Sequence, residues 1–245
     1  MLQAPKTILL TGGTSGIGLA LLKQLHAQGH KLIVVARNGH ALQQLKDEYA
    51  GLTIYECDLS SRFQVESLAD FILREHAGVE IVFNNAGVQY TSMFIDDGFE
   101  FDSIEQETTL NFLAPVWITA LLLPMLLEAK QASAIVNISS GLAYAPKTQS
   151  AVYCATKAAI HSVSQSLRYQ LENTPVTVFE AIMPLVDTPM TAGRGRGKIS
   201  PEDAARQIIE GINKNRPEIF VGKTKILPFL MRLSPGLVRN IMKKF

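Results

Sequence analysis

The chain has 245 residues, 47% hydrophobic and 18% charged, which suits one folded α/β domain and excludes a disordered chain. Its 23 Lys and Arg residues nearly cancel its 22 Asp and Glu residues, so there is no basic footprint for nucleic acid. The presence of only two cysteines and the lack of a signal-peptide pattern predict a reducing, cytoplasmic location. The most apolar run, 116–127, is shorter than the roughly 20 residues of a membrane-spanning helix.

Short apolar runs alternate along the chain with stretches of helical period, which predicts a doubly wound parallel sheet with helices on both faces. The predicted strands are 7–11, 31–36, 53–57, 80–84, 134–139, 176–182 and 218–221. The predicted helices are 16–28, 41–49, 63–76, 104–128, 151–171 and 201–213. Without a linker or an internal repeat, the simplest interpretation is one domain over 1–245.

Three segments interrupt this alternation. Residues 93–107 carry six carboxylates, which favours a solvated loop or the start of a helix. The segment 188–200 contains alternating Gly and Arg, and we expect a flexible lid over a substrate pocket. Residues 225–245 combine apolar side chains with cations, and two prolines divide them. This extension is expected to cover the domain or a subunit contact, with a membrane-surface helix as the alternative.

A glycine-rich turn follows the first predicted strand. Its sequence is Thr11-Gly12-Gly13-Thr14-Ser15-Gly16-Ile17-Gly18, with a helix predicted to begin at Gly16. Glycines at such a turn let the backbone approach a diphosphate, whose charge is favoured at the helix N-terminus. The turn therefore predicts a dinucleotide site, although a turn of this kind on its own has a purely structural alternative.

Four further motifs stand in the order and spacing of one family. They are Asn84-Asn85-Ala86-Gly87, Asn111, Ser140 and Tyr153-x-x-x-Lys157. With the glycine-rich turn, they resemble the compact short-chain dehydrogenases/reductases over about 6–188. The resemblance implies a single Rossmann-type domain. It also implies a homodimer or homotetramer formed through the helices at 104–128 and 151–171.

Tyr153 and Lys157 lie four positions apart, so a helix would present them on one face. A free tyrosine has a pKa of about 10, and a nearby ammonium would favour its phenolate. Tyr153 would then exchange a proton with the oxygen of a carbonyl or alcohol, which Ser140 would hold by a hydrogen bond. By resemblance, Lys157 also binds the nicotinamide ribose, and Asn111 anchors a water of a proton relay.

The end of the second strand indicates the choice of cofactor. NAD-binding folds usually place a carboxylate there, whereas this chain has Ala36 followed by Arg37. A guanidinium can pair with the 2′-phosphate of NADP, so we expect NADP(H) rather than NAD(H). By resemblance Asp58 contacts the adenine, with a helix N-cap as its alternative. The family usually has Pro-Gly where this chain has Pro184-Leu185.

The expected site has a cofactor half and a substrate half. The residues expected to bind the cofactor are Gly12, Thr14, Ser15, Gly16, Ile17, Gly18, Arg37, Asp58, Leu59, Asn85, Ala86, Gly87, Tyr153, Lys157, Pro184, Val186 and Thr188. The segments expected to line the substrate pocket are 88–95, 141–150 and 185–200, with an apolar contribution from Val88, Leu142, Tyr144 and Met190. The histidines lack ligand spacing with the cysteines, so no metal site is predicted.

These patterns favour an NADP(H)-dependent oxidoreductase that acts on a small carbonyl or alcohol, with a hydrophobic ketone or acyl-type carbonyl as the substrate. Two alternatives remain open. One is a non-catalytic regulator that senses NADP(H). The other is a reductase docked on a membrane or an acyl carrier through Arg194, Arg196 and the C-terminal cations.

Overall fold

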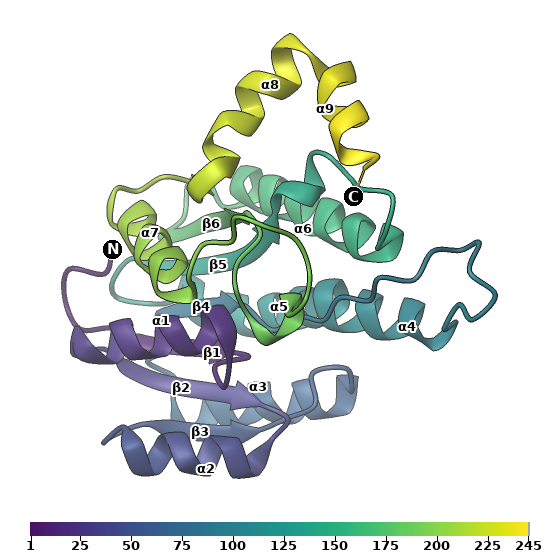
Figure 1. The fold of residues 1–245 in the computed structure, drawn as a ribbon. Helices are drawn as coiled ribbons and strands as arrows, with labels where there is room; N and C mark the ends of the chain where they lie inside the picture. Colours follow the sequence, from purple (N-terminus) through teal and green to yellow (C-terminus); the bar gives the residue numbers. More distant parts are fainter. Residues whose placement is uncertain (245) are drawn as a thin grey trace.

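A computed structural model of the chain describes residues 1–244, which contain one sheet of seven parallel strands in the order β3-β2-β1-β4-β5-β6-β7 (Figure 1). The strands are β1 (Thr7–Thr11), β2 (Lys31–Ala36), β3 (Thr53–Glu56), β4 (Ile81–Asn84), β5 (Ser133–Ser140), β6 (Val176–Met183) and β7 (Glu218–Phe220). Each predicted strand lies within one residue of these bounds. The predicted Rossmann-type parallel sheet is confirmed.

Helices cover both faces of the sheet. The α-helices are α1 (Gly16–Ala27), α2 (Gly39–Glu48), α3 (Arg62–Glu75), α4 (Asp102–Thr108), α5 (Ala114–Leu127), α6 (Ala151–Gln170), α7 (Pro201–Asn213), α8 (Leu227–Leu233) and α9 (Pro235–Met242). The shorter turns are η1 (Thr109–Leu113, a π-helix), η2 (Gly141–Ala143), η3 (Pro189–Thr191) and η4 (Gly222–Ile226). The predicted helix 104–128 is thus α4, η1 and α5 joined end to end.

The strands are apolar on both sides because each side faces a separate helical layer. In β1, Ile8 and Leu10 pack in the core with α1, α2 and α7, while Leu9 packs in the opposite core with α3 and α5. This alternation follows from the two-residue period of a strand. It explains why the strands are continuous hydrophobic runs in the sequence.

The strand order reverses between β1 and β4, where a doubly wound sheet opens a crevice for ligands. Thr11 ties the two strand ends together. Its hydroxyl donates to the carbonyl oxygen of Phe83 at 3.1 Å and accepts from the backbone N–H groups of Asn85 and Ala86 at 3.0 and 3.1 Å. The turn after β1 and the segment after β4 are therefore held side by side at the carboxyl edge of the sheet.

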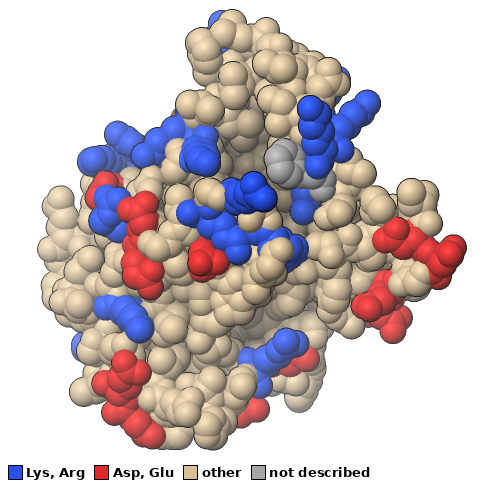
Figure 2. All heavy atoms as spheres, viewed as in Figure 1, with Lys and Arg blue, Asp and Glu red and all other residues tan. Residues whose placement is uncertain are grey.

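Two features stand out at the surface. Helices α8 and α9 form an arch that projects from the body (Figure 1), and a band of Lys and Arg side chains lies beneath it (Figure 2). The continuous helix Asp102–Leu127 is long and apolar enough to cross a membrane by length and composition. It is longer than the apolar run considered in the sequence, but Ile118, Leu122 and Leu126 pack it against the sheet as a core helix.

Candidate active site

A cavity of about 1390 Å³ runs along the carboxyl edge of the sheet. Every residue predicted to bind the cofactor lines it, from the glycine-rich turn at one end to Thr188 at the other. Ser140 also lines it, whereas Asn111 lies behind the wall and is 1% exposed. The fold thus brings sequence-distant motifs together around one space large enough for a dinucleotide and a second molecule.

The glycine-rich turn fits a dinucleotide diphosphate. Gly12 has a φ of +68°, and a Cβ there would lie 2.8 Å from the Cα of Ala86. A Cβ on Gly18 would lie only 2.1 Å from the carbonyl oxygen of Gly12. Ser15, the N-cap of α1, makes no side-chain cap hydrogen bond, so the first N–H groups of α1 stay available to an anion.

The other end of the cofactor half contains Arg37 and Asp58. Arg37 is exposed at the end of β2 and lines the cavity. The carboxylate of Asp58 accepts from the backbone N–H and the hydroxyl of Ser60 at 3.0 and 2.7 Å. These bonds, and more weakly Arg37, hold the pKa of Asp58 below its ordinary value. The N-cap of α3 is Ser61 rather than Asp58, which leaves Asp58 facing the cavity.

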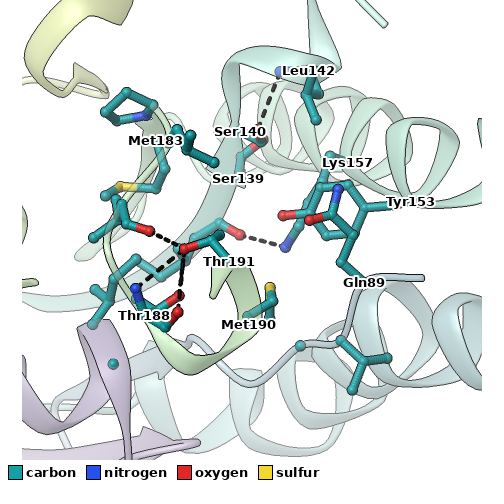
Figure 3. A pocket seen from close by; sticks show the side chains of 18 of the residues that line it. Gln89, Ser139, Ser140, Leu142, Tyr153, Lys157, Met183, Thr188, Met190 and Thr191 are labelled. Carbon is teal, nitrogen blue, oxygen red and sulfur yellow. Dashed lines mark hydrogen bonds between the residues drawn. The ribbon is translucent and has the colours of Figure 1, made fainter. Parts of the chain in front are cut away.

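Tyr153 and Lys157 lie side by side on α6, opposite the end of β5 (Figure 3). The ammonium nitrogen of Lys157 is 5.5 Å from the centre of the Tyr153 ring, within the range of a cation–π contact. The same nitrogen donates to the carbonyl oxygen of Ile138 at 2.9 Å. Lys157 is 5% exposed, so the strand end and the aromatic ring determine its position.

Burial dominates the protonation of both side chains. It raises the pKa of Tyr153 above its ordinary value, with Cys154 and Glu107 adding to the effect and Arg194 opposing it. Burial also lowers the pKa of Lys157 to about 8, against the opposing charge of Glu180. The sequence argument expected Lys157 to favour the phenolate. The direction of this shift is opposite to the one expected from Lys157.

Two adjacent serines end β5 and both line the cavity (Figure 3). The hydroxyl oxygen of Ser140 accepts from the backbone N–H of Leu142 at 3.1 Å, which leaves its own proton free to donate. The hydroxyl of Ser139 is buried and has no hydrogen-bond partner among residues 1–244. Ser140 remains the predicted contact for the reacting oxygen, and Ser139 is its nearest competitor.

Asn111 is held by the segment that follows β4. Its side-chain N–H donates to the carbonyl oxygen of Val88 at 2.8 Å, and its oxygen accepts from the N–H of Val88 at 2.9 Å. A Cβ on Gly87 would lie 2.9 Å from that oxygen, so the close approach requires glycine. Asn111 lies in η1, and such π-helical turns often mark functional sites because they reorient one side chain.

Glu107 lies in a different environment from the predicted one. It was counted among the solvated carboxylates of 93–107, but it is 2% exposed and accepts from the backbone N–H of Tyr90 at 2.6 Å. Burial raises its pKa, and the N–H groups of Tyr90 and Tyr153 oppose that shift. Glu107 precedes Asn111 by four residues, one helical turn, and that spacing was the signal that could have identified it.

The two ends of the loop that contains the predicted lid 188–200 are paired through their backbones. Val186 and Ile199 form an isolated parallel bridge, and the side chain of Leu185 fills the space where a Cβ on Gly195 would lie. The family usually has glycine at position 185. The packing of the Leu185 side chain against Gly195 explains why this chain has leucine there instead. Asp187, 69% exposed, pairs with Lys198 at 3.1 Å, as expected of a turn residue.

The substrate half differs in part from the predicted lining. Residues 88–90 line the cavity, but 91–95 do not. Tyr144 was predicted to line it and does not, because its ring packs on His161 and Phe220 with centroids 4.6 and 5.8 Å away. Residues of the C-terminal segment also line the cavity, which was not predicted. Those lining residues include Lys223, Leu227, Leu230, Val238 and Ile241.

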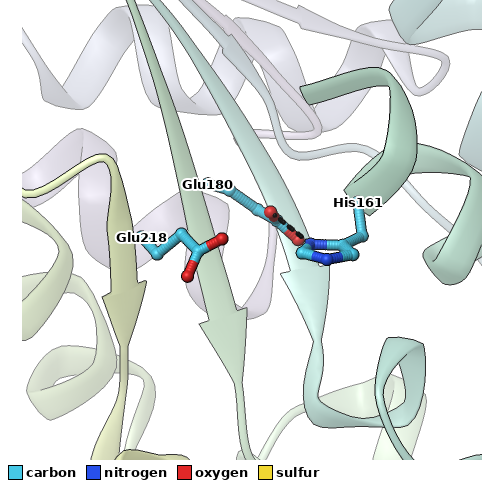
Figure 4. A group of neighbouring side chains, drawn as sticks. All are labelled: His161, Glu180 and Glu218. Carbon is cyan, nitrogen blue, oxygen red and sulfur yellow. Dashed lines mark hydrogen bonds and ion pairs between the residues drawn. The ribbon is translucent and has the colours of Figure 1, made fainter. Parts of the chain in front are cut away.

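A cluster of three side chains joins α6 to strands β6 and β7 (Figure 4). It consists of His161, Glu180 and Glu218. Their ligand atoms lie within 4.8 Å of one another, the spacing of a metal site. However, His161 already contacts Glu180 at 2.8 Å, and the guanidinium of Arg168 lies 3.8 Å from Glu180 and 3.4 Å from Glu218. Arg168 therefore supplies the positive charge that a metal would bring, and we interpret the cluster as a structural ion-pair network.

Comparison with known proteins agrees with this geometry. The family model described as short chain dehydrogenase matches residues 6–198 of the chain. The chain belongs to this family. An uncharacterized oxidoreductase of Bacillus subtilis, DltE, is 37% identical over 226 residues, which cover 89% of each protein. A fatty acyl-CoA reductase of Acinetobacter baylyi is 30% identical and covers 97% of this chain and 82% of its own length.

Solved structures of family members superpose closely on this one. A Burkholderia cenocepacia enzyme in complex with NADP has a TM-score of 0.89 at 20% identity and covers 99% of both chains. A Sphingobium yanoikuyae enzyme with NADPH has a TM-score of 0.78 at 27% identity over 88% of this chain and 87% of its own. A Burkholderia phymatum enzyme with NAD reaches 0.86 at 22% identity over 100% and 98%. The protein is an oxidoreductase of this family, and it has the fold of the family members that bind nicotinamide cofactors.

Proposed function

We propose that the protein is an NADP(H)-dependent reductase in which Tyr153 donates a proton to a carbonyl oxygen. The observation that carries this proposal is the position of Tyr153 beside Lys157 in the cavity that continues to the glycine-rich turn. A tyrosine has an ordinary pKa of about 10, so Tyr153 carries a proton at neutral pH that it can donate to a carbonyl oxygen. When bound, the cofactor supplies the hydride.

Each remaining residue has a task in this proposal. Ser140 donates to the reacting oxygen and holds it beside Tyr153, and Lys157 anchors the ribose next to the nicotinamide. Asn111 fixes the segment 85–88 through Val88. By resemblance to the family, it also anchors the water of the relay. The turn 12–18, with Asn85, Ala86 and Gly87, holds the diphosphate and its neighbouring ribose. Pro184, Val186 and Thr188 face the nicotinamide, while Asp58 and Leu59 face the adenine.

We propose NADP(H) over NAD(H) because Arg37 occupies the position where NAD-binding folds carry a carboxylate. The NADPH complex of the Sphingobium relative supports this choice, although the family also includes NAD complexes. The substrate is a carbonyl with an apolar body. An acyl-CoA is a specific candidate, since the Acinetobacter relative that covers nearly the whole chain is a fatty acyl-CoA reductase.

The test is oxidation of NADPH and NADH with a panel of aldehydes, ketones, diketones, quinones and acyl thioesters. We expect turnover with NADPH that falls by about three orders of magnitude in Tyr153→Phe, the middle of the range for losing a general acid. Ser140→Ala should lose more activity than Ser139→Ala, its matched control. Arg37→Asp should reverse the preference between the two donors. Equal activity of Tyr153→Phe and wild type would overturn the mechanism.

The regulator alternative makes the opposite prediction. It expects NADPH to bind while every member of the panel fails to react, and it expects Tyr153→Phe to leave binding unchanged. Docking on a membrane or carrier is a separate alternative, in which the protein is still a reductase. The exposed apolar side chains of the arch, such as Phe229 and Leu233, would contact the membrane or carrier. This alternative predicts salt-sensitive binding to anionic vesicles or to a carrier protein.

A further inference from the structure

The two halves of the cavity differ in charge. The substrate half is lined by cations and by no carboxylate among residues 1–244, while Asp58 faces the adenosine end. The cations are Lys147, Arg194, Arg196, Lys223 and Lys244, apart from Lys157. Figure 2 shows Lys and Arg side chains as a band beneath the arch, whereas the whole chain has nearly balanced charges. A cleft with one sign of charge concentrates ligands of the opposite sign.

Lys147 and Arg194 are the two cations of this set that matter most, because both are half-buried at the substrate half. The charge of Arg194 acts on Tyr153, and Lys147 lies near Arg194 and Cys154. Neither has a carboxylate within 4 Å in the described part of the chain. Burial, and then the charge of Arg194, lower the pKa of Lys147. In contrast, half-buried Lys198 in the same lid pairs with Asp187 at 3.1 Å. Partly buried cations without a partner are costly unless an anion joins them.

The apolar side of the same cavity comes from the arch. Leu227 and Leu230 of α8, with Val238 and Ile241 of α9, line it from above. The hydroxyl of Thr148 donates to the carbonyl oxygen of Lys243 at 2.9 Å, which joins the end of the arch to the loop that carries Lys147. The apolar roof and the cations therefore enclose one space next to Tyr153.

We propose that the substrate half binds an anionic amphiphile, with its carboxylate or phosphate held by Lys147 and Arg194 and its apolar chain beneath α8 and α9. This inference rests on the proposed function, because it names the substrate class of the same site. An uncharged ketone would supply no negative charge to either cation. A ligand that carries only charge would leave the apolar roof in contact with water.

Binding to the NADP⁺-loaded protein tests the proposal without turnover. Calorimetric titration would compare decanoate, decyl phosphate and decanol, three probes that share one chain. We expect at least one anion to bind about tenfold more tightly than decanol, since a charge-assisted hydrogen bond is worth that much. The preferred anion identifies the headgroup as a carboxylate or a phosphate. Equal affinity for all three probes would overturn the proposal.

Single variants then locate the subsite. Lys147→Met and Arg194→Met should each weaken the preferred anion about tenfold and leave the affinity for decanol and the KM for NADPH unchanged. Lys225→Met removes the same charge from an exposed position outside the cavity, and it is expected to change none of these values. A rise in the KM for NADPH in both cavity variants would assign these cations to the cofactor and refute the proposal.

Turnover separates this inference from the proposed function. We expect 4-oxodecanoate to be reduced with a kcat/KM about tenfold above that of its methyl ester, and acetoacetyl-CoA to exceed the N-acetylcysteamine thioester if phosphates are preferred. If each neutral compound is reduced as fast as its charged partner, the anionic subsite is refuted and the proposed reductase function is retained. Loss of all turnover with the anion preference in binding retained would refute the reductase instead.

Discussion

At the residue scale, the behaviour of Lys157 follows from its burial rather than from its sequence motif. The spacing of four residues placed Lys157 beside Tyr153, and the structure confirms that neighbourhood. The spacing did not indicate that the ammonium would lie over the ring and donate to Ile138, nor that burial would lower its pKa to about 8. Desolvation depends on every atom around the side chain, so local sequence does not predict it.

The lowered pKa of Lys157 predicts the pH dependence of the free enzyme. The ammonium form predominates below about pH 8 and the neutral amine above it, so the positive charge is lost as pH rises. We expect kcat/KM for NADPH to fall roughly tenfold per pH unit well above that pKa. Steady-state kinetics from pH 6 to about 10 measure it. Lys157→Met should have a low kcat/KM that does not fall in this pH range. A flat wild-type profile would contradict the prediction.

For Glu107 the sequence predicted exposure and the structure shows burial. Glu107 is one of six carboxylates in a segment expected to be solvated, yet the fold buries it against the N–H groups of Tyr90 and Tyr153. Composition averages over a segment, whereas burial depends on the face of the helix on which each residue lies. Asp96 and Asp97, in the same segment, do stay exposed.

At the element scale, the turn after β1 is where sequence and structure agree most closely. The glycines of this turn were predicted to let the backbone approach a diphosphate, and they also let it approach Asn85 and Ala86. The side-chain amide of Asn85 donates to the carbonyl oxygens of Thr11 and Gly12 at 2.9 and 3.1 Å. The motifs at 11–18 and 84–87 therefore build one cradle together.

This packing predicts the outcome of a single methyl substitution. Gly18→Ala would place a Cβ 2.1 Å from the carbonyl oxygen of Gly12, so the turn must shift. We expect a loss of about 1–3 kcal/mol in the free energy of unfolding and weaker NADPH binding. Thermal melts and fluorescence titration would measure both. Gly78→Ala, which meets no atom within 4 Å, is the matched control, and equal behaviour of the two variants would contradict the argument.

At the scale of the whole molecule, α5 is unusual because it contains no charged residue, although part of it faces outward. One side packs in the core through Ile118, Leu122 and Leu126. Ala120, Pro124 and Leu127 are exposed on the other side. A helix that is apolar all round is normally buried. We therefore propose that α5 lies in the homodimer or homotetramer interface expected from the family resemblance.

A charge on that face tests the interface. We expect the wild-type protein to sediment as a dimer or tetramer at micromolar concentration, and Ala120→Arg to sediment as a monomer, because an unpaired buried charge is strongly unfavourable. Ala27→Arg, at an exposed position at the end of α1, should leave the assembly intact. Sedimentation velocity distinguishes the species. A wild-type monomer would refute the proposal.

The sequence by itself determined the layers, the strands and the family, because hydrophobic period and glycine spacing are local properties that the chain carries wherever it folds. It also identified residues that line the cofactor half of the cavity. Only the tertiary structure decided that Tyr144 turns away, that Glu107 is buried, and that the C-terminal helices roof the cavity. These outcomes depend on contacts between residues far apart in the chain. Packing and desolvation at such contacts are set by the surrounding tertiary structure rather than by the neighbouring residues in the sequence.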